Sequence, residues 1–179
     1  MINILLVDDH ELVRTGVSKI LNEVKGFKVL KECKTGEDAV KFCRQTEADV
    51  ILMDMDMPGM GGLEATKKIL RFAPEAKVII LTAHTEDPFP TKVMQIGASG
   101  YLTKGTASQE MVNAIRQVHS GQRYLPANIA QQMALSQFKS AEENPFSELS
   151  DRELQIMLMV TRGEKVPVIS EHLHLSTKT

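Results

Sequence analysis

The sequence predicts an α/β fold with a doubly wound, five-stranded parallel sheet, followed by a linker and a short all-α segment. Up to about residue 122, short β-rich apolar runs alternate with longer stretches of helical period, the pattern of a parallel sheet with helices on both faces. Three of the apolar runs are continuous rather than alternating, as expected of strands buried on both sides.

Each apolar run and each helical stretch is assigned in chain order. The predicted strands are Ile2–Val7, Phe27–Lys31, Val50–Met53, Lys77–Leu81 and Gly100–Thr103. The predicted helices between and after them are Glu11–Asn22, Gly36–Gln45, Leu63–Phe72, Pro90–Ile96 and Ser108–Ser120. In the first helix, one apolar stripe at helical spacing is expected from Leu12, Val13, Val17, Ile20, Leu21 and Val24.

The chain after residue 122 changes in composition. Residues 123–147 are rich in Gln, Glu, Asn and Pro and read as a linker, with one amphipathic helix from Ala127 to Phe138. Ser150 and Glu153 then have the spacing of a capping box that starts a helix ending at Gly163. A second short helix is expected over Pro167–Leu173. The predicted organisation is therefore 1–122, 123–147 and 148–179.

Composition excludes several classes of protein. The chain has 179 residues, with 21 Lys and Arg against 23 Asp and Glu, so no overall basic field attracts nucleic acid. Two cysteines, Cys33 and Cys43, suit a reducing compartment. No apolar run is long enough to cross a membrane and no signal peptide opens the chain, so we expect a cytoplasmic protein without membrane contact.

Polar side chains follow the predicted strands where ligands bind in an open parallel sheet, at the carboxyl ends. Asp8 and Asp9 follow the first strand and Asp54 follows the third, and converging carboxylates require a cation such as Mg²⁺. Thr82 and Lys104 follow the fourth and fifth strands, and a hydroxyl with an ammonium complements a phosphoryl group. Asp54 is thus predicted to be a carboxylate nucleophile that forms an acyl phosphate.

These strand ends resemble those of receiver domains of two-component response regulators, which have the flavodoxin-like fold. The resemblance covers about two-thirds of the chain, and four motifs carry it in the correct order. They are Leu5-Leu6-Val7-Asp8-Asp9-His10, Asp54-Met55-Asp56-Met57-Pro58-Gly59, Leu81-Thr82-Ala83 and Gly100-Tyr101-Leu102-Thr103-Lys104.

The resemblance implies a role for each site residue. Asp54 accepts a phosphoryl group from a sensor histidine kinase; Asp9, Asp54 and the backbone carbonyl of Asp56 bind Mg²⁺, and Asp8 holds a metal-bound water. Thr82 and Lys104 contact the phosphoryl group, and Tyr101 turns inward to reshape the surface of the fourth helix, fifth strand and fifth helix. Such a regulator is not an enzyme beyond self-phosphorylation and autodephosphorylation, and it forms a homodimer on activation.

The rest of the chain resembles the helix-turn-helix domain of the NarL/FixJ (LuxR-type) class. Leu149-Ser150-x-Arg152-Glu153 and Ile169-Ser170-x-x-Leu173-x-Leu175-Ser176 match its opening and first two helices. The recognition helix of that class begins about where this chain ends, so we expect the unit to be incomplete and promoter DNA to bind only the full-length parent. Asp9–Arg14 and Gly121–Tyr124 look most like the GacA/UvrY/VarA-type regulators, which control small regulatory RNA genes.

Two departures and two alternatives stay open. Gly105 stands where receivers usually have proline, and Asp56 and His84 each lie two residues past a site residue, where they are expected to tune the lifetime of the phosphate. One alternative is a stand-alone signalling adaptor without DNA binding. The other is an aspartyl-phosphate hydrolase, which would place its acid pair on the first strand rather than at Asp54 and Asp56.

Overall fold

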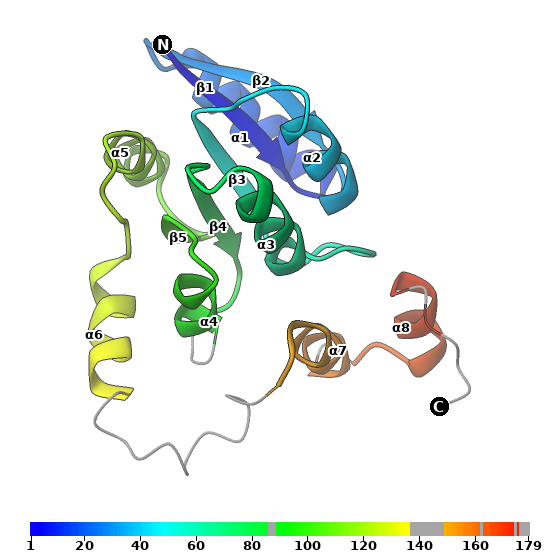
Figure 1. The fold of residues 1–179 in the computed structure, drawn as a ribbon. Coiled ribbons are helices and arrows are strands. Elements are labelled where there is room, and N and C mark those ends of the chain that lie inside the picture. Colours follow the sequence, from blue (N-terminus) through cyan, green and yellow to red (C-terminus); the bar gives the residue numbers. More distant parts are fainter. Residues whose placement is uncertain (86–88, 137–148, 162, 174, 176–179) are drawn as a thin grey trace.

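The N-terminal part of the chain folds into one sheet with helices on both faces, and smaller helices follow it (Figure 1). The five strands are β1 (Ile2–Val7), β2 (Phe27–Cys33), β3 (Val50–Asp54), β4 (Val78–Thr82) and β5 (Gly100–Thr103). The computed structural model describes residues 1–85, 89–136, 149–161, 163–173 and 175.

The strand order fixes where a site can form. The order is β2-β1-β3-β4-β5 and every neighbouring pair is parallel, which confirms the predicted doubly wound sheet. The order reverses between β1 and β3, where Val7 pairs with Met53. The residues that follow these two strands therefore lie side by side at the switch point, where open sheets bind ligands.

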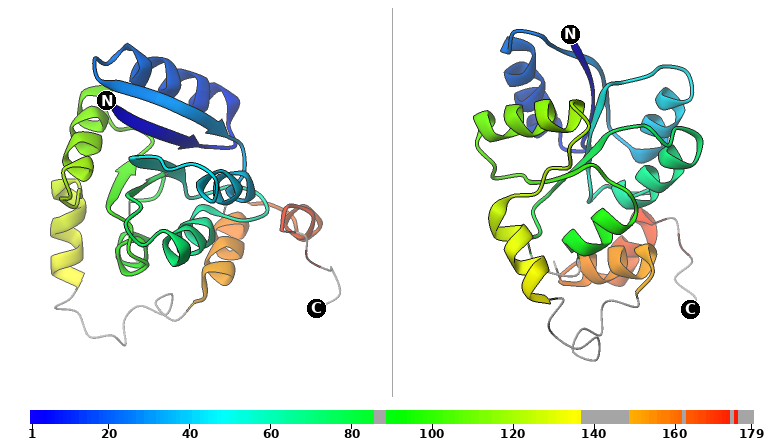
Figure 2. Two further views of the ribbon diagram at one scale, coloured as in Figure 1. Left: turned by 45° about the horizontal axis from the view of Figure 1, so that its top comes forward. Right: turned by 60° about the vertical axis from the view of Figure 1, so that its left-hand side comes forward.

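Two helix layers bury the sheet (Figure 2). One face packs against α1 (Glu11–Glu23) and α5 (Ser108–His119), and the other against α2 (Gly36–Cys43), α3 (Gly62–Phe72) and α4 (Phe89–Gln95). Because side chains alternate along a strand, each central strand supplies both cores, and every residue of β3 and β4 is buried. This double coverage explains the continuous apolar runs.

The expected apolar stripe of α1 is wrong in part. Leu12 is 87% exposed and Ile20 37% exposed, whereas Arg14 and Ser18 occupy buried positions. The helix is rotated so that the Arg14 guanidinium reaches inward and Nη1 donates to the backbone carbonyl of Asp8 at 2.7 Å. A hydrogen bond from a buried cation to the strand end thus displaces the hydrophobic pattern.

The linker begins by covering the edge of the sheet. Tyr101 N donates to Tyr124 O at 3.0 Å and Tyr124 N to Ser99 O at 3.0 Å, which pairs Tyr124 with β5. Helix α6 (Ala127–Ser136) follows and buries Ile129 in the same apolar cluster as α4. The predicted end of this helix at Phe138 lies outside the described residues.

Two helices form the C-terminal unit, α7 (Asp151–Thr161) and α8 (Val166–His172). The capping box is confirmed, since Ser150 N donates to Glu153 Oε2 at 2.8 Å and Glu153 N to Ser150 Oγ at 3.3 Å. Gly163 has a φ of 77°, as the predicted stop after α7 requires. Among the described residues, none of the helices has the length and apolar character that a bilayer crossing demands.

Candidate functional site

Three side chains from three strand ends meet at the carboxyl edge of the sheet. Lys104 Nζ lies 2.8 Å from Asp54 Oδ2 and 3.0 Å from Asp8 Oδ2, and both carboxylate groups are fully buried. Asp8 follows β1, Asp54 ends β3 and Lys104 follows β5. The switch point thus brings together residues up to 96 positions apart in the sequence.

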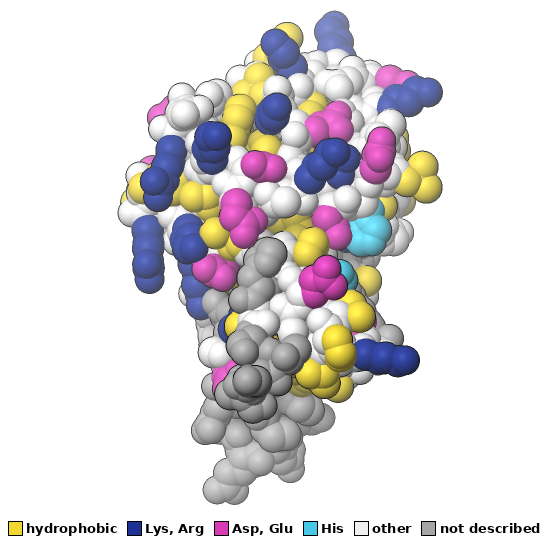
Figure 3. Space-filling model, turned by 90° about the vertical axis from the view of Figure 1, so that its right-hand side faces the viewer, with side chains coloured by type: hydrophobic (Ala, Val, Ile, Leu, Met, Phe, Trp, Pro, Cys, Tyr) yellow, Lys and Arg dark blue, Asp and Glu magenta, His cyan; other side chains and the backbone are white. Residues whose placement is uncertain are grey.

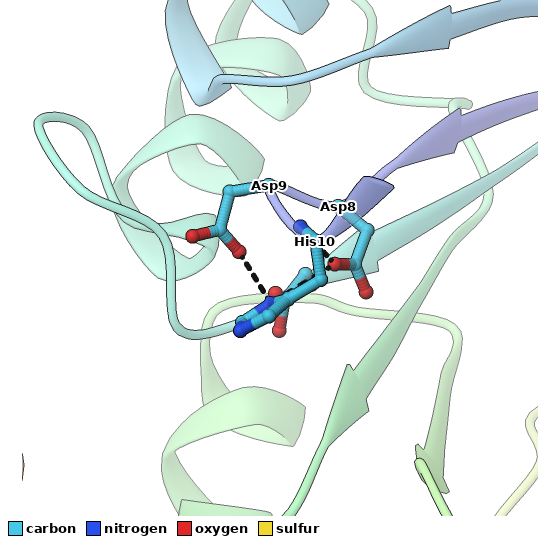
Figure 4. Close-up of side chains that lie close together, drawn as sticks. Asp8, Asp9 and His10 are labelled. Atoms are coloured by element: carbon cyan, nitrogen blue, oxygen red, sulfur yellow. Dashed lines mark hydrogen bonds and ion pairs between the residues drawn. The ribbon is translucent and has the colours of Figure 1, made fainter. Parts of the chain in front are cut away.

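Asp9 and His10 form the outer side of this cluster (Figure 4). His10 Nδ1 lies 2.8 Å from Asp9 Oδ1 and 3.4 Å from Asp8 Oδ1, and the His10 amide donates to Asp8 Oδ1 at 2.8 Å. One ligand atom from each of Asp8, Asp9, His10 and Asp54 falls within 4.8 Å of all the others. His10, whose side chain is 62% exposed, therefore both faces water and belongs to the cluster.

The charges at this edge are unbalanced. Burial, and then the neighbouring Asp8 carboxylate, raise the pKa of Asp54 to about 7, although Lys104 and the amide of Asp56 act in the opposite direction. Burial alone would lower the pKa of Lys104, but its contacts with Asp54 and Asp8 raise it above the ordinary value. One ammonium does not neutralise the site, so a further cation would be stabilised there.

A chain of contacts links the acid cluster to the loop after β4. The amide of Asp56 donates to Asp54 Oδ1 at 3.1 Å, and the amide of His84 donates to Thr82 Oγ1 at 3.0 Å. The side chains of Asp56 and His84 also contact each other, with His84 Nε2 3.0 Å from Asp56 Oδ2. Tyr101 is fully buried and its hydroxyl donates to the backbone carbonyl of His84. Every residue singled out at the strand ends thus lies in one connected region.

Sequence reasoning missed how His84 is held. Its ring stacks on Phe89 of α4, with centroids 4.8 Å apart and planes at 29°, while its Nε2 reaches Asp56. Asp56 lies two residues after Asp54 and His84 lies two residues after Thr82, and this shared spacing was the only sequence signal that linked Asp56 with His84. Phe89 is only five residues further along the chain, but Asp56 is 28 residues earlier, so no local pattern predicts that pairing.

The close packing beneath Asp54 also escaped prediction. A Cβ on Gly62 would lie 2.1 Å from the backbone oxygen of Asp54. Only glycine permits α3 to begin directly against the strand that carries this carboxylate. The residue type at position 62 is therefore part of how the site is built.

The donor set suits a hard cation. Carboxylate and carbonyl oxygens with waters are the ligands that Mg²⁺ prefers, and three carboxylates gather here. Burial first, and then the Asp8 carboxylate, raise the pKa of Asp54, and a bound cation would offset both by stabilising the ionised form. The residues present fit a magnesium ion.

This fold and edge geometry define the class of the protein. Residues 4–116 match the response regulator receiver domain and residues 147–179 match the bacterial regulatory proteins of the luxR family. The chain belongs to the response regulators of two-component systems that carry a LuxR-type DNA-binding domain. The second match favours a transcription regulator over the stand-alone adaptor.

Relatives with high sequence identity support this assignment. The chain is 63% identical to the response regulator UvrY of Escherichia coli K12 and 52% identical to the response regulator GacA of Pseudomonas aeruginosa PAO1. All of this chain is aligned in both comparisons, with 83% and 84% of the two relatives. The resemblance to GacA/UvrY/VarA-type regulators is thereby confirmed.

Solved structures agree with the architecture. A LuxR-family two-component response regulator from Aurantimonas sp. SI85-9A1 is 36% identical, with a TM-score of 0.73 over 76% of this chain and 98% of that chain. The response regulator RcsB of Salmonella typhimurium is 23% identical and shares the fold over 99% of this chain and 85% of its own, with a TM-score of 0.70.

Proposed function

We propose that Asp54 accepts a phosphoryl group from a sensor histidine kinase and thereby switches the C-terminal helix-turn-helix unit. The observation that supports this most directly is the buried Asp54 carboxylate held at 2.8 Å from Lys104 Nζ. A buried carboxylate beside a fixed ammonium is arranged to attack phosphorus while the ammonium offsets the charge that develops on the phosphoryl oxygens.

Mg²⁺ is the proposed cofactor, held by Asp9, Asp54 and the Asp56 carbonyl, with Asp8 on a metal-bound water. When bound, the ion supplies charge neutralisation between the carboxylates and the incoming phosphoryl oxygens. The chain orients the acceptor: the Asp56 amide holds Asp54 Oδ1 and Lys104 holds Oδ2. Both carboxylate oxygens are therefore fixed before the donor arrives.

Thr82 and Tyr101 are proposed to carry the signal away from Asp54. The Thr82 hydroxyl accepts from the His84 amide at 3.0 Å and is free to turn its own proton towards a phosphoryl oxygen. The Tyr101 hydroxyl donates to the carbonyl of the same His84. A shift of Thr82 would therefore move the loop that contains His84 and, through this hydrogen bond, Tyr101. A charge placed on Asp54 would thus bias the α4–β5–α5 surface.

Incubation with acetyl phosphate and Mg²⁺ tests this function. We expect one phosphoryl group to be incorporated per chain. No incorporation is expected when the metal is chelated before acetyl phosphate is added, or in Asp54→Asn. Rapid release of many equivalents of inorganic phosphate would instead identify a hydrolase and contradict the assignment as a non-enzyme phosphoacceptor. Glu64→Gln, on the solvent side of α3 in an ion pair with Lys68, is the matched control and should be phosphorylated like the wild type.

The wider organisation completes the proposal. We divide the chain into a receiver at 1–122, a linker at 123–147 and a helix-turn-helix unit at 148–179, of which 86–88, 137–148, 162, 174 and 176–179 lie outside the described residues. The protein would bind promoter DNA in the cytoplasm, at small regulatory RNA genes. These statements depend on the family and on the resemblance to GacA and UvrY.

Phosphorylation is further proposed to produce a homodimer. Light scattering with and without beryllofluoride measures this, because the fluoride complex mimics an acyl phosphate. A doubled mass on addition supports the dimer, and an unchanged mass in a sample that has bound beryllofluoride contradicts it.

A further inference from the structure

The C-terminal helices lie against the loop that follows Asp54. Gln155 Nε2 of α7 donates to Met57 O at 3.0 Å, and Arg152 Nη1 donates to Gly59 O at 3.0 Å. The amide of Gly59 in turn donates to His172 O of α8 at 2.8 Å. Three hydrogen bonds therefore fasten residues 57–59 to a unit more than 90 positions further along the chain.

Apolar packing reinforces these bonds. Leu154 is fully buried and Leu158 is 7% exposed, in the same cluster as Met55, Met57 and Leu63 of the receiver. Arg152 also donates to the carbonyl of Leu173 and to Gln155 Oε1. One guanidinium thus holds α7, the end of α8 and the receiver loop together. The contact is a packed interface rather than a chance approach of two surfaces.

This interface forms one side of a cavity next to the acid cluster. A cavity of about 260 Å³ opens beside the acid cluster, with Asp9, His10 and Asp56 on the receiver side and Gln155, Glu164 and His172 on the other. Figure 3 shows histidine and acidic side chains gathered at the junction between the receiver and the C-terminal helices. Asp54 itself is fully buried, and Asp9 and Asp56 line the cavity beside it, so a phosphoryl donor that approaches from this side passes between the receiver and the C-terminal helices.

The two kinds of phosphoryl donor differ greatly in the space they need. A small acyl phosphate is below the size of the ligands that fill pockets of about 300 Å³ and more, so it enters this cavity with α7 and α8 in place. A protein that carries a phosphohistidine covers about 800 Å² of its partner when it docks. Docking of that extent over the cavity would require α7 and α8 to move, because Gln155, Glu164 and His172 form its other side.

We propose that α7 and α8 act as a size filter on phosphoryl donors, set by Arg152 and Gln155. In either case the bond from phosphorus to the donor's nitrogen or oxygen breaks, its electron pair leaves with the donor, and a bond from Asp54 Oδ to phosphorus forms. Only a protein donor must wait for the helices to leave, so its apparent affinity falls by the fraction of chains that are open. The inference rests on the proposed function of Asp54.

The test compares two donors on the same variants. The probes are acetyl phosphate and the phosphorylated phosphotransfer domain of a sensor kinase that phosphorylates the wild-type chain. Gln155→Ala removes one interface hydrogen bond, and we expect kcat/KM for the protein donor to rise about 3- to 10-fold. The acetyl phosphate rate should stay within about twofold, because that donor does not need the helices to open. Glu171→Gln, on the exposed side of α8, is the matched control and should change neither rate.

A second measurement shows whether the interface has opened. Hydrogen exchange at the Gly59 amide, which is bonded to His172 O, should become faster in Gln155→Ala. Gly61→Ala tests the receiver side, because its Cβ would lie 3.1 Å from Gln155 Nε2, and it should act in the same direction. Arg152→Ala removes all three hydrogen bonds of the guanidinium, to Gly59 O, Leu173 O and Gln155 Oε1, and should give the largest increase in both exchange and the protein-donor rate.

Three outcomes would overturn the filter. They are faster exchange at Gly59 with an unchanged ratio of the two donors, an equal change in both rates, and exchange at Gly59 that stays as slow as in the wild type in all three variants. Phosphorylation of Asp54→Asn by either donor would instead contradict the proposed function, so the two failures are distinguishable.

Discussion

The receiver and the C-terminal unit differ in how completely their apolar side chains are buried. In the receiver, the central strands are buried on both faces, and Leu52 and Ile80 are fully enclosed by the two helix layers. In the C-terminal unit, Met159, Ile169 and Leu173 form a small separate cluster. The apolar side chains of Val160 and Val166 beside it remain 55% and 66% exposed.

This difference assigns separate tasks to the two regions. Acyl phosphate chemistry needs carboxylates and an ammonium held in fixed positions, and a doubly covered sheet supplies that rigidity. A switch needs an element whose attachment is weak enough for one charge to change it. The α7–α8 unit is fastened by a few hydrogen bonds and two buried leucines, so it is the part that can respond.

The largest effect is expected beneath the acceptor. Gly62→Ala would drive a Cβ to 2.1 Å from the Asp54 backbone oxygen, and backbone on both sides leaves no room to yield. We expect a loss of more than about 4 kcal/mol in the free energy of unfolding, measured by urea denaturation. Gly16→Ala is the matched control because no atom lies within 4 Å of its Cβ position, and it should stabilise the chain by up to about 1 kcal/mol. Equal effects of the two changes would refute the tight packing of the site.

Truncation of one buried leucine in each region tests whether the two regions unfold separately. Leu52→Ala empties a fully buried position and should cost about 2–5 kcal/mol in the main unfolding transition. Leu173→Ala acts in the small cluster of the C-terminal unit, so it should leave that transition unchanged and speed hydrogen exchange only in α7 and α8. A shift of the main transition by Leu173→Ala would show that the two regions unfold as one.

The charge of Asp54 makes the stability of the receiver depend on pH. In the unfolded chain this carboxyl titrates near pH 4, whereas burial beside Asp8 raises its pKa to about 7 in the folded chain. The stabilisation from the neutral form is fully present below pH 4 and is lost as the pH rises through 7. Without divalent cations, wild type should therefore lose on the order of 4 kcal/mol relative to Asp54→Asn across this window, about 1.4 kcal/mol for each of three pKa units. Parallel pH curves for the two proteins would contradict the raised pKa.

The smallest effect is expected at the start of α7. Ser150→Ala removes the hydroxyl that accepts from the Glu153 amide and should weaken the helix by about 1 kcal/mol. Because the cap belongs to the C-terminal unit, amide exchange in α7 should rise while receiver amides keep their rates. Slower or unchanged exchange in α7 would mean that the receiver contact alone holds the helix.

Local sequence patterns predicted most of the fold. Period and strand-end chemistry predicted all five strands within two residues at either end, the order of the helices and the capping box at Ser150. They also predicted that Asp8, Asp54 and Lys104 lie at one edge of the sheet, because the carboxyl ends of parallel strands share an edge.

Features set by tertiary contacts could not be predicted in this way. The inward Arg14 of α1 depends on a strand-end carbonyl, and the His84 ring depends on Asp56, 28 residues earlier in the chain. The docking of Arg152 on Gly59 joins two parts of the chain that have no shared periodicity. Such pairings exist only once the sheet has brought its loops to one side.

The position of the phosphoryl group tests the account most directly. Wild-type protein would be incubated with acetyl phosphate and Mg²⁺, reduced with borohydride to trap the acyl phosphate, and digested for tandem mass spectrometry. We expect the reduced residue to be Asp54, with no modified peptide from Asp54→Asn. Trapping at Asp8, Asp9 or Asp56, or an equal yield from Asp54→Asn, would contradict it.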